Sequence, residues 1–150
     1  MPQKTAAPSL QIRALTERLG QDPRSRVFLD LAKAHLAAGD PGEAVRVCRE
    51  GLEKHPRYHS ARVFLGKALV AAGSHGEAAS ELEKVVTEAP DNILARRLLA
   101  EAQEAGCRRG DALSTYRSLL LLTPGEPEVE ARIADLEAGT GEAAPVAPLP

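Results

Sequence analysis

The sequence predicts an all-α protein built from three copies of one helix hairpin. A closing proline, a Gly-acid-Ala triplet, and a leucine followed by a small residue each recur every 34 residues. The repeated positions are Pro56, Pro90 and Pro124; Gly42-Glu43-Ala44, Gly76-Glu77-Ala78 and Gly110-Asp111-Ala112; and Leu31, Leu65 and Leu99. Because independent positions share one period, they indicate internal duplication of a structural unit.

The composition agrees with closely packed helices. The chain has 150 residues, of which 43% are hydrophobic but only 3% aromatic, with no Trp. The core must therefore be formed by Leu, Val, Ile and Ala side chains, which suits helices better than a sheet sandwich. This length allows one domain of ordinary globular composition.

The first helix of the first unit is expected on the stretch that ends at Gly39. Phe28, Leu31, Ala32 and His35 follow the spacing i, i+3, i+4, i+7, which places them on one helical face. Gly39 can adopt the left-handed conformation that ends a helix.

The second helix of this unit is expected from Asp40 to Pro56. Asp40 is a good N-cap, Pro41 fits the first turn, and Glu43 can complete a capping box. Pro56 then prevents the helix from continuing.

The later units repeat this design with one exception. The second unit has a stop at Gly73 and a capping box predicted over residues 74–77. In the third unit Gly106 comes one residue early, Cys107 occupies the usual Gly position, and Arg108 is a poor N-cap. The sequence therefore predicts a looser or displaced third corner.

The combined pattern resembles the tetratricopeptide repeat (TPR). The resemblance covers residues 25–124, with repeats at 25–58, 59–92 and 93–126. It implies a right-handed α-solenoid of three hairpins with flanking helices. The chain departs from the family pattern at the position of Phe28, where the later repeats carry Arg62 and Arg96.

Both ends have apolar patterns that predict flanking helices. A leading helix is expected at 9–20 and a closing helix at 127–138, together bounding a TPR domain at 9–138. Residues 1–8 are expected to be flexible, and the Ala/Pro-rich residues 139–150 to form a disordered tail. That tail is interpreted as either inert or a short polyproline ligand.

The TPR resemblance implies a concave groove lined by positions two, five, six, nine and twelve of each repeat. These positions carry Arg26, Leu29, Asp30, Lys33 and Leu36; Ser60, Val63, Phe64, Lys67 and Val70; and Leu94, Arg97, Leu98, Glu101 and Glu104. The partner-binding residues are expected to be Arg26, Leu29, Lys33, Val63, Phe64, Lys67, Arg97 and Leu98.

The groove residues predict a protein or peptide partner with apolar anchors and acidic residues. Burial of Phe64 and Leu98 would supply the affinity, while Lys33 and Lys67 would influence partner choice and association rate. The alternative is that Phe64 and Leu98 only pack the second repeat on the third, and that both lysines are solvated.

One TPR subfamily, which clamps the C-terminal carboxylate of chaperones with Lys, Arg and Asn residues, does not fit. Among the matching groove positions only Lys33 is suitable, and Leu29, Phe64, Leu94 and Leu98 are apolar. A chaperone-tail partner is therefore not expected.

Other classes of function are disfavoured. The net charge of −2 and pI near 6.1 argue against nucleic acid, because the basic residues are interleaved with acids. No nucleophile triad, phosphate loop or GxGxxG motif is present, and Pro56 separates His55 from His59, so neither an enzyme, a cofactor nor a metal site is expected.

The sequence favours an interaction scaffold within a bacterial assembly of the secretion, pilus, motility or polarity type. The alternatives are a self-associating structural subunit and a non-catalytic subunit of an enzyme complex. Two distant cysteines, no signal peptide and no long apolar stretch predict a cytoplasmic protein without membrane insertion.

Overall fold

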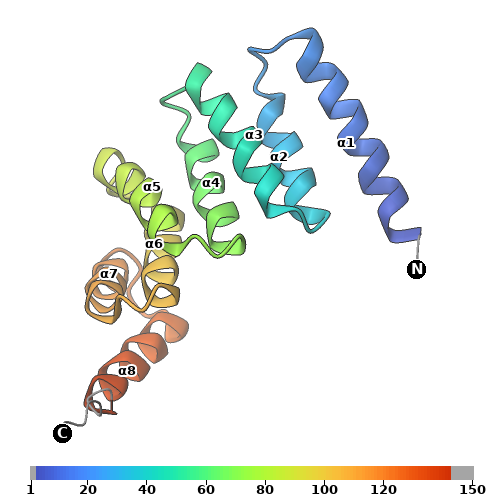
Figure 1. Cartoon of the computed structure of the whole chain (residues 1–150). Helices are drawn as coiled ribbons and strands as arrows, with labels where there is room; N and C mark the ends of the chain where they lie inside the picture. Colours follow the sequence, from blue (N-terminus) through green and yellow to red (C-terminus); the bar gives the residue numbers. More distant parts are fainter. Residues whose placement is uncertain (1–2, 143–150) are drawn as a thin grey trace, which may run out of the picture.

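The computed structural model describes residues 3–142, and the side chains of residues 10–139. These residues form eight α-helices and no strand (Figure 1). The helices are α1 Gln3–Gln21, α2 Val27–Ala37, α3 Pro41–Lys54, α4 His59–Ala71, α5 His75–Glu88, α6 Ile93–Ala105, α7 Arg109–Leu122 and α8 Pro127–Glu142.

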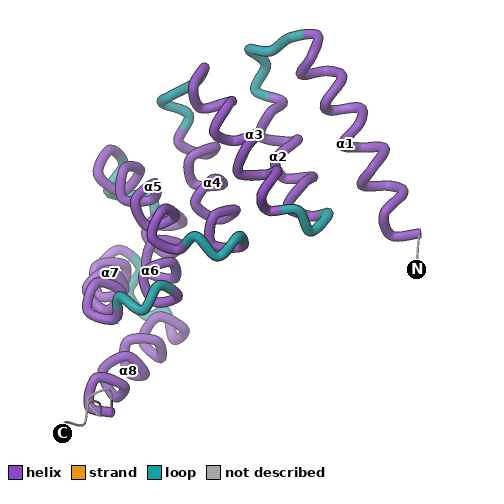
Figure 2. The backbone as a smooth tube through the Cα atoms, viewed as in Figure 1, coloured by secondary structure: helices purple, strands orange, loops and turns teal. Residues whose placement is uncertain are grey.

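Three helix hairpins stack in a curved row. Helices α2 and α3, α4 and α5, and α6 and α7 pack as pairs, and each pair packs on the next through α3–α4 and α5–α6 contacts. The first helices also touch one another, α2 on α4 and α4 on α6, so that they form one continuous wall on the inner side of the arc (Figures 1 and 2). The prediction of an all-α solenoid is confirmed.

The three repeated leucines occupy equivalent buried places. Leu31, Leu65 and Leu99 are 4%, 2% and 5% exposed. Small residues next to them allow close helix packing: a Cβ on Gly66 would lie 2.6 Å from Leu82 of the facing helix. The repeat pattern in the sequence therefore corresponds to one packing scheme used three times.

The three corners between paired helices have the same geometry. Gly39 and Gly73 have φ of 84°, and Cys107 in the equivalent place has φ of 62°. The N–H of the following residue donates to the carbonyl five residues earlier in all three: Asp40 to His35 at 2.9 Å, Ser74 to Leu69 at 2.8 Å and Arg108 to Gln103 at 2.8 Å. The prediction of a looser or displaced third corner was wrong, because the backbone hydrogen bonds hold Cys107 in the left-handed conformation.

The predicted helix caps are partly present. The Asp40 carboxylate accepts a hydrogen bond from the Glu43 N–H at 3.2 Å, as expected of an N-cap. Ser74 makes no side-chain cap bond, contrary to the predicted capping box, and Glu77 instead pairs with Arg49 of α3. Glu77 therefore joins two repeats rather than closing its own helix end.

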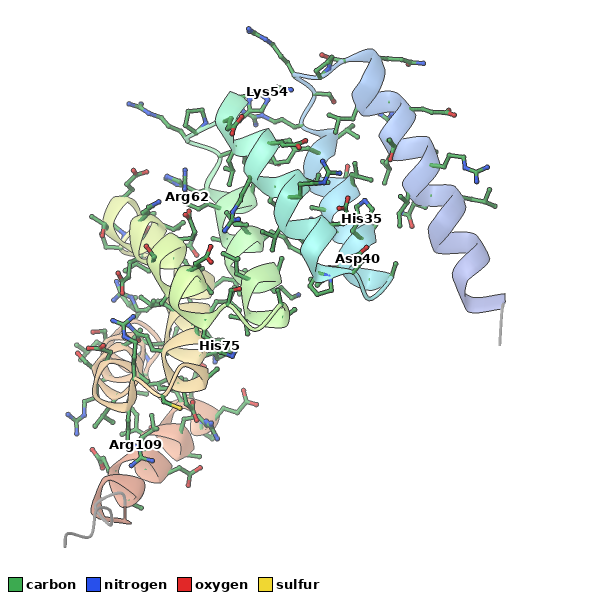
Figure 3. All side chains as sticks on the ribbon, viewed as in Figure 1. His35, Asp40, Lys54, Arg62, His75 and Arg109 are labelled. Atoms are coloured by element: carbon green, nitrogen blue, oxygen red, sulfur yellow. The ribbon has the colours of Figure 1, made fainter. Side chains whose placement is uncertain are left out.

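The two arginines that replace the aromatic position of Phe28 have a shared role. Arg62 donates to the carbonyl of Pro56 at 3.0 Å, and Arg96 donates to the carbonyl of Pro90 at 2.7 Å. Each guanidinium thus binds the proline that closes the preceding repeat. Arg62 also pairs with Glu81 of α5 at 2.6 Å, and both side chains are about four-fifths buried, at 18% and 21% exposure (Figure 3).

The end helices are longer than the sequence predicts. Helix α1 begins at Gln3, six residues before the expected start of the leading helix at residue 9, and Ala6 and Ala7 favour this conformation. Helix α8 continues to Glu142, beyond the expected end at residue 138, because Arg109 of α7 donates to the Gly139 carbonyl at 2.6 Å and ties this stretch to α7 (Figure 3). The expectations for residues 1–2 and 143–150 lie outside the described residues.

The buried apolar side chains form two clusters that meet at α6. The first extends from Leu15 of α1 to Leu99 and Ala102 of α6. The second joins Ala100 of α6 to α7 and α8 through Ala112, Tyr116, Leu119, Val129 and Leu136. Helices α7 and α8 therefore share a core with one side of α6, while the other side of α6 belongs to the first cluster.

Candidate partner-binding groove

The inner wall contains a pocket of about 310 Å³ between α2, α4 and α6. Six of the eight predicted binding residues line it: Leu29, Lys33, Val63, Phe64, Lys67 and Leu98. Ser60, Asn92 and Leu94 complete the lining. The 34-residue period thus brings together side chains that are far apart in the sequence, and their role in binding stays a prediction.

The floor of this pocket is apolar. Leu29 and Val63 are buried, and Phe64 and Leu98 are half-buried while packing against the first core cluster. The two interpretations of Phe64 and Leu98 are compatible, because each side chain packs on the core with one side and lines the pocket with the other.

Leu94 is one of three residues of this pocket, with Ser60 and Asn92, that the predicted binding set omitted. It is 57% exposed, which makes it the most accessible large apolar side chain in the pocket. Asn92 was also missed: its side chain caps α6 by accepting from the Ala95 N–H at 2.9 Å. The signal for Leu94 was present in its repeat position, the second, which faces the groove in this family.

Two lysines line the pocket together with the apolar floor. Lys33 and Lys67 occupy the ninth position of successive repeats, and both are exposed. Neither makes an ion pair or a side-chain hydrogen bond within the part of the chain whose side chains are described. An acidic group of a partner would therefore not have to displace an internal carboxylate from them.

The remaining two predicted residues lie outside this pocket. The Arg26 guanidinium stacks over the Tyr58 ring, with its central carbon 4.7 Å from the ring centroid. Arg97 pairs with Glu126, and this pairing lowers the pKa of Glu126 and raises that of Arg97. Both arginines therefore interact with other side chains of the protein, and neither lines this pocket.

A second, larger pocket of about 530 Å³ lies between α6, α7 and α8. Its lining is strongly charged and consists of Arg97, Glu101, Glu104, Ala105, Tyr116, Glu128, Val129 and Arg132. Glu104 accepts a hydrogen bond from the Tyr116 hydroxyl at 3.1 Å and also pairs with Arg132. Arg97 is the member of the predicted binding set in this lining; Glu101 and Glu104 were expected to face the groove, and Tyr116, Glu128 and Arg132 were not assigned to it.

A third pocket, of about 430 Å³, lies between α1 and α2. Asp30, which the sequence placed in the groove, lines it together with Lys33. Lys33 therefore borders two hollows, one on each side of α2.

The histidines and cysteines do not assemble into a reactive site. The His55 Nε2–H donates to the Arg24 carbonyl at 2.7 Å, and His59 contacts Glu88 at 2.7 Å. Burial raises the pKa of the Cys48 thiol to about 12, whereas Cys107 is exposed. Within residues 3–142 no group of three or more His, Cys, Asp or Glu side chains could hold a metal ion, and no helix there is long and apolar enough to cross a membrane.

Comparison with protein families identifies the class of protein. Two tetratricopeptide-repeat models match residues 29–93 and 69–136, so that together they cover most of the chain. The protein belongs to the tetratricopeptide-repeat family. A search of curated proteins found no significant match.

Solved structures show the same fold. MamA from Desulfovibrio magneticus RS-1 aligns with a TM-score of 0.83 at 21% identity, covering 93% of this chain and 79% of that one. Another MamA crystal structure aligns with a TM-score of 0.83 at 17% identity, covering 99% and 92%. The first TPR domain of Spaghetti (RPAP3), solved with the HSP90 peptide SRMEEVD, aligns with a TM-score of 0.70 at 16% identity, covering 79% and 97%.

Proposed function

We propose that this protein is a non-catalytic scaffold that binds a segment of a partner protein in the groove formed by α2, α4 and α6. The observation that carries the proposal is the pocket on the inner wall, in which an apolar floor lies beneath two lysines without internal partners. Apolar clefts with a few polar groups are the usual form of a binding site. The peptide bound by the RPAP3 domain supports such a role for this architecture.

The partner is expected to insert apolar side chains beside Leu94, Leu98 and Phe64. Burying one large apolar side chain contributes about 1.5–3 kcal/mol, whereas an exposed ion pair contributes about 0–1 kcal/mol. The apolar contacts would therefore supply most of the affinity, and Lys33 and Lys67 would select acidic neighbours of the anchors.

This recognition differs from a carboxylate clamp. The inner wall offers Leu29, Phe64 and Leu98 where several polar donors would be needed to hold a terminal carboxylate. We place the protein in the cytoplasm, within a bacterial multiprotein assembly, and this placement rests on composition and on the breadth of the family.

Affinity purification followed by mass spectrometry tests the proposal. The wild type is compared with Lys33→Glu/Lys67→Glu and with Leu94→Asp, whose exposed side chain can be changed without disturbing the core. Both variants are expected to lose the same partner. Arg13→Glu/Arg57→Glu is the matched control, since it changes the net charge equally at exposed positions outside the groove.

Retention of the same proteins in the same amounts by both groove variants would place the binding surface elsewhere. Phe64→Ala separates packing from binding. A melting point lowered by several degrees with unchanged partner recovery would show that Phe64 serves only the core.

A further inference from the structure

The charge on the inner wall changes sign along the row of helices. The ninth position of each successive first helix carries Lys33 in α2, Lys67 in α4, Glu101 in α6 and Asp135 in α8, each 34 residues apart. Helix α8 continues the series because it begins 34 residues after α6. All four side chains are exposed. Lys33, Lys67 and Glu101 have no ion pair among the described side chains, whereas Asp135 pairs with Arg132 of its own helix at 3.8 Å.

Two other groove-facing positions, the twelfth and the second, also become negatively charged towards the C-terminal end of the row. The twelfth position is Leu36 and then Val70 in the first two repeats, but Glu104 in the third. The second position is Ser60 and then Leu94 in α4 and α6, but Glu128 in α8. The pocket at α2, α4 and α6 therefore has two lysines and no carboxylate, and the pocket at α6, α7 and α8 has three glutamates.

Internal pairing leaves the second pocket with unpaired negative charge. Its two arginines are already engaged, Arg97 with Glu126 and Arg132 with Glu104. Glu101 and Glu128 make no ion pair or side-chain hydrogen bond among the side chains of residues 10–139. Their charges act on Arg97 only through space, adding to the effect of Glu126 in raising the pKa of that guanidinium. A ligand in the groove would therefore meet ammonium groups on α2 and α4 and carboxylates on α6 and α8.

The two pockets are neighbours on one surface. Leu94 and Leu98 of α6 line the first, while Arg97 and Glu101 of the same helix line the second. Figure 1 shows α2, α4, α6 and α8 following one another along the row of helices. A segment lying from α2 to α8 would therefore pass lysines, then apolar side chains, then carboxylates.

We propose that the groove accepts a charge-segregated peptide segment in a single orientation, with acidic residues beside Lys33 and Lys67, apolar anchors beside Leu94 and Leu98, and basic residues beside Glu101, Glu128 and Asp135. This inference rests on the proposed function, because it specifies the partner of the same wall. The reverse orientation would place like charges together at both ends, which disfavours it.

A random peptide library displayed on phage tests the charge pattern. The wild type is expected to enrich peptides with acidic residues on one side of an apolar residue and basic residues on the other. Lys33→Glu/Lys67→Glu, which makes the wall acidic throughout, should enrich peptides that are basic on both sides. Glu101→Lys/Asp135→Lys should enrich peptides that are acidic on both sides, and Arg13→Glu/Arg57→Glu should enrich the wild-type set.

The two cysteines allow the orientation to be measured directly. Cys107 is exposed on the turn after α6, whereas Cys48 is fully buried, so a thiol-reactive dye labels Cys107 selectively. A peptide enriched on the wild type carries the second dye at its acidic or at its basic end. Energy transfer between the two dyes should be stronger when the second dye is at the basic end of the peptide, because that end lies beside α6 and α8.

A fourfold exchange of charge provides the decisive comparison. Lys33→Glu/Lys67→Glu/Glu101→Lys/Asp135→Lys keeps the net charge, so the same peptide should bind with similar affinity but with the order of energy transfer inverted. Either end variant alone should bind it about tenfold more weakly.

The outcomes separate this inference from the proposed function. Enrichment of peptides that depend on Leu94 but show no charge segregation, or equal transfer from both ends, would overturn the inference and leave the groove as a binding site. Failure to enrich any peptide that is lost with Leu94→Asp would overturn both.

Discussion

Cys107 has a left-handed backbone conformation that glycine adopts more easily. The corners at Gly39 and Gly73 use glycine for a positive φ, and the third corner uses Cys107 with φ of 62°. A side chain with a Cβ disfavours this conformation by about 1–2 kcal/mol. The three backbone hydrogen bonds of the corner and the packing of α6 on α7 offset this strain.

Cys107→Gly is therefore expected to stabilise the protein. The relief of strain exceeds the extra unfolded-state entropy of glycine, and the net gain should be about 0.5–1 kcal/mol in urea unfolding. Cys107→Ser is the control, because it keeps a Cβ and should leave stability nearly unchanged. A glycine variant no more stable than the serine variant would show that the corner is not strained.

Glu81 makes a pH-dependent contribution to the stability of the fold. Burial raises its pKa, but hydrogen bonds from Lys84 and Arg62 outweigh burial and lower the pKa below the ordinary value of 4.5. A carboxyl whose folded-state pKa is lowered stabilises the fold above its unfolded-state pKa. This stability is lost as the pH falls through 4.5 and then through the lower folded-state value.

Glu81→Gln should accordingly lower the free energy of unfolding by about 1 kcal/mol at neutral pH. The difference from the wild type should shrink as the pH falls below 4.5 and disappear once the pH is below the lowered folded-state pKa of Glu81. Thermal melts across this range measure the effect, with the exposed Glu53→Gln as control. A difference that stays constant with pH would contradict an electrostatic origin.

At the element scale, close approach of helices depends on small residues at defined places. Gly66 of α4 faces Leu82 of α5, which is fully buried. Gly76 in α5 has no neighbour within 4 Å of an added Cβ and no positive φ. The two glycines thus differ in packing while both lie in helices.

Opposite effects are expected from the same substitution at these two sites. Gly66→Ala should lower stability by about 1–3 kcal/mol, because Leu82 must move to admit the methyl group. Gly76→Ala should raise stability by up to about 1 kcal/mol through helix propensity. Chemical denaturation measures both, and a loss at Gly76 equal to that at Gly66 would exclude the packing explanation.

The helices and their pairing could be predicted from the sequence because one period repeats at many positions. The resemblance to the tetratricopeptide repeat implied that Leu29, Phe64 and Leu98 face the groove. What could not be predicted depends on single side-chain contacts between repeats. The extension of α8 through Arg109, the contacts of Arg62 and Arg96 with closing prolines, and the pairing of Glu77 with Arg49 have no counterpart in the repeat pattern.

At the scale of the whole molecule, the core is divided at α6. The first cluster contains Leu82 and Cys48, and the second contains Leu119. In a stack of repeats each unit contacts only its neighbours, so separate cores can open separately. Helices α7 and α8 should therefore unfold without opening the first two hairpins, while Leu99 and Ala102 keep α6 packed on the first cluster.

The rate at which the buried thiol of Cys48 is labelled measures whether the two core clusters open separately. Leu82→Ala and Leu119→Ala each remove a fully buried side chain and should each cost about 3 kcal/mol locally. Leu82→Ala should accelerate labelling of Cys48 by a thiol reagent strongly, and Leu119→Ala should leave it slow. Equal acceleration by both would show that the molecule opens as one cooperative unit.

The exposure of the ninth position has a consequence for how such a protein diverges. Lysine and glutamate codons differ by a single base, and the side chains of Lys33, Lys67 and Glu101 are exposed. After gene duplication, a descendant chain can therefore acquire a different charge order, and with it a different partner, in single mutational steps that leave folding intact. Natural selection can act on recognition at this position separately from stability.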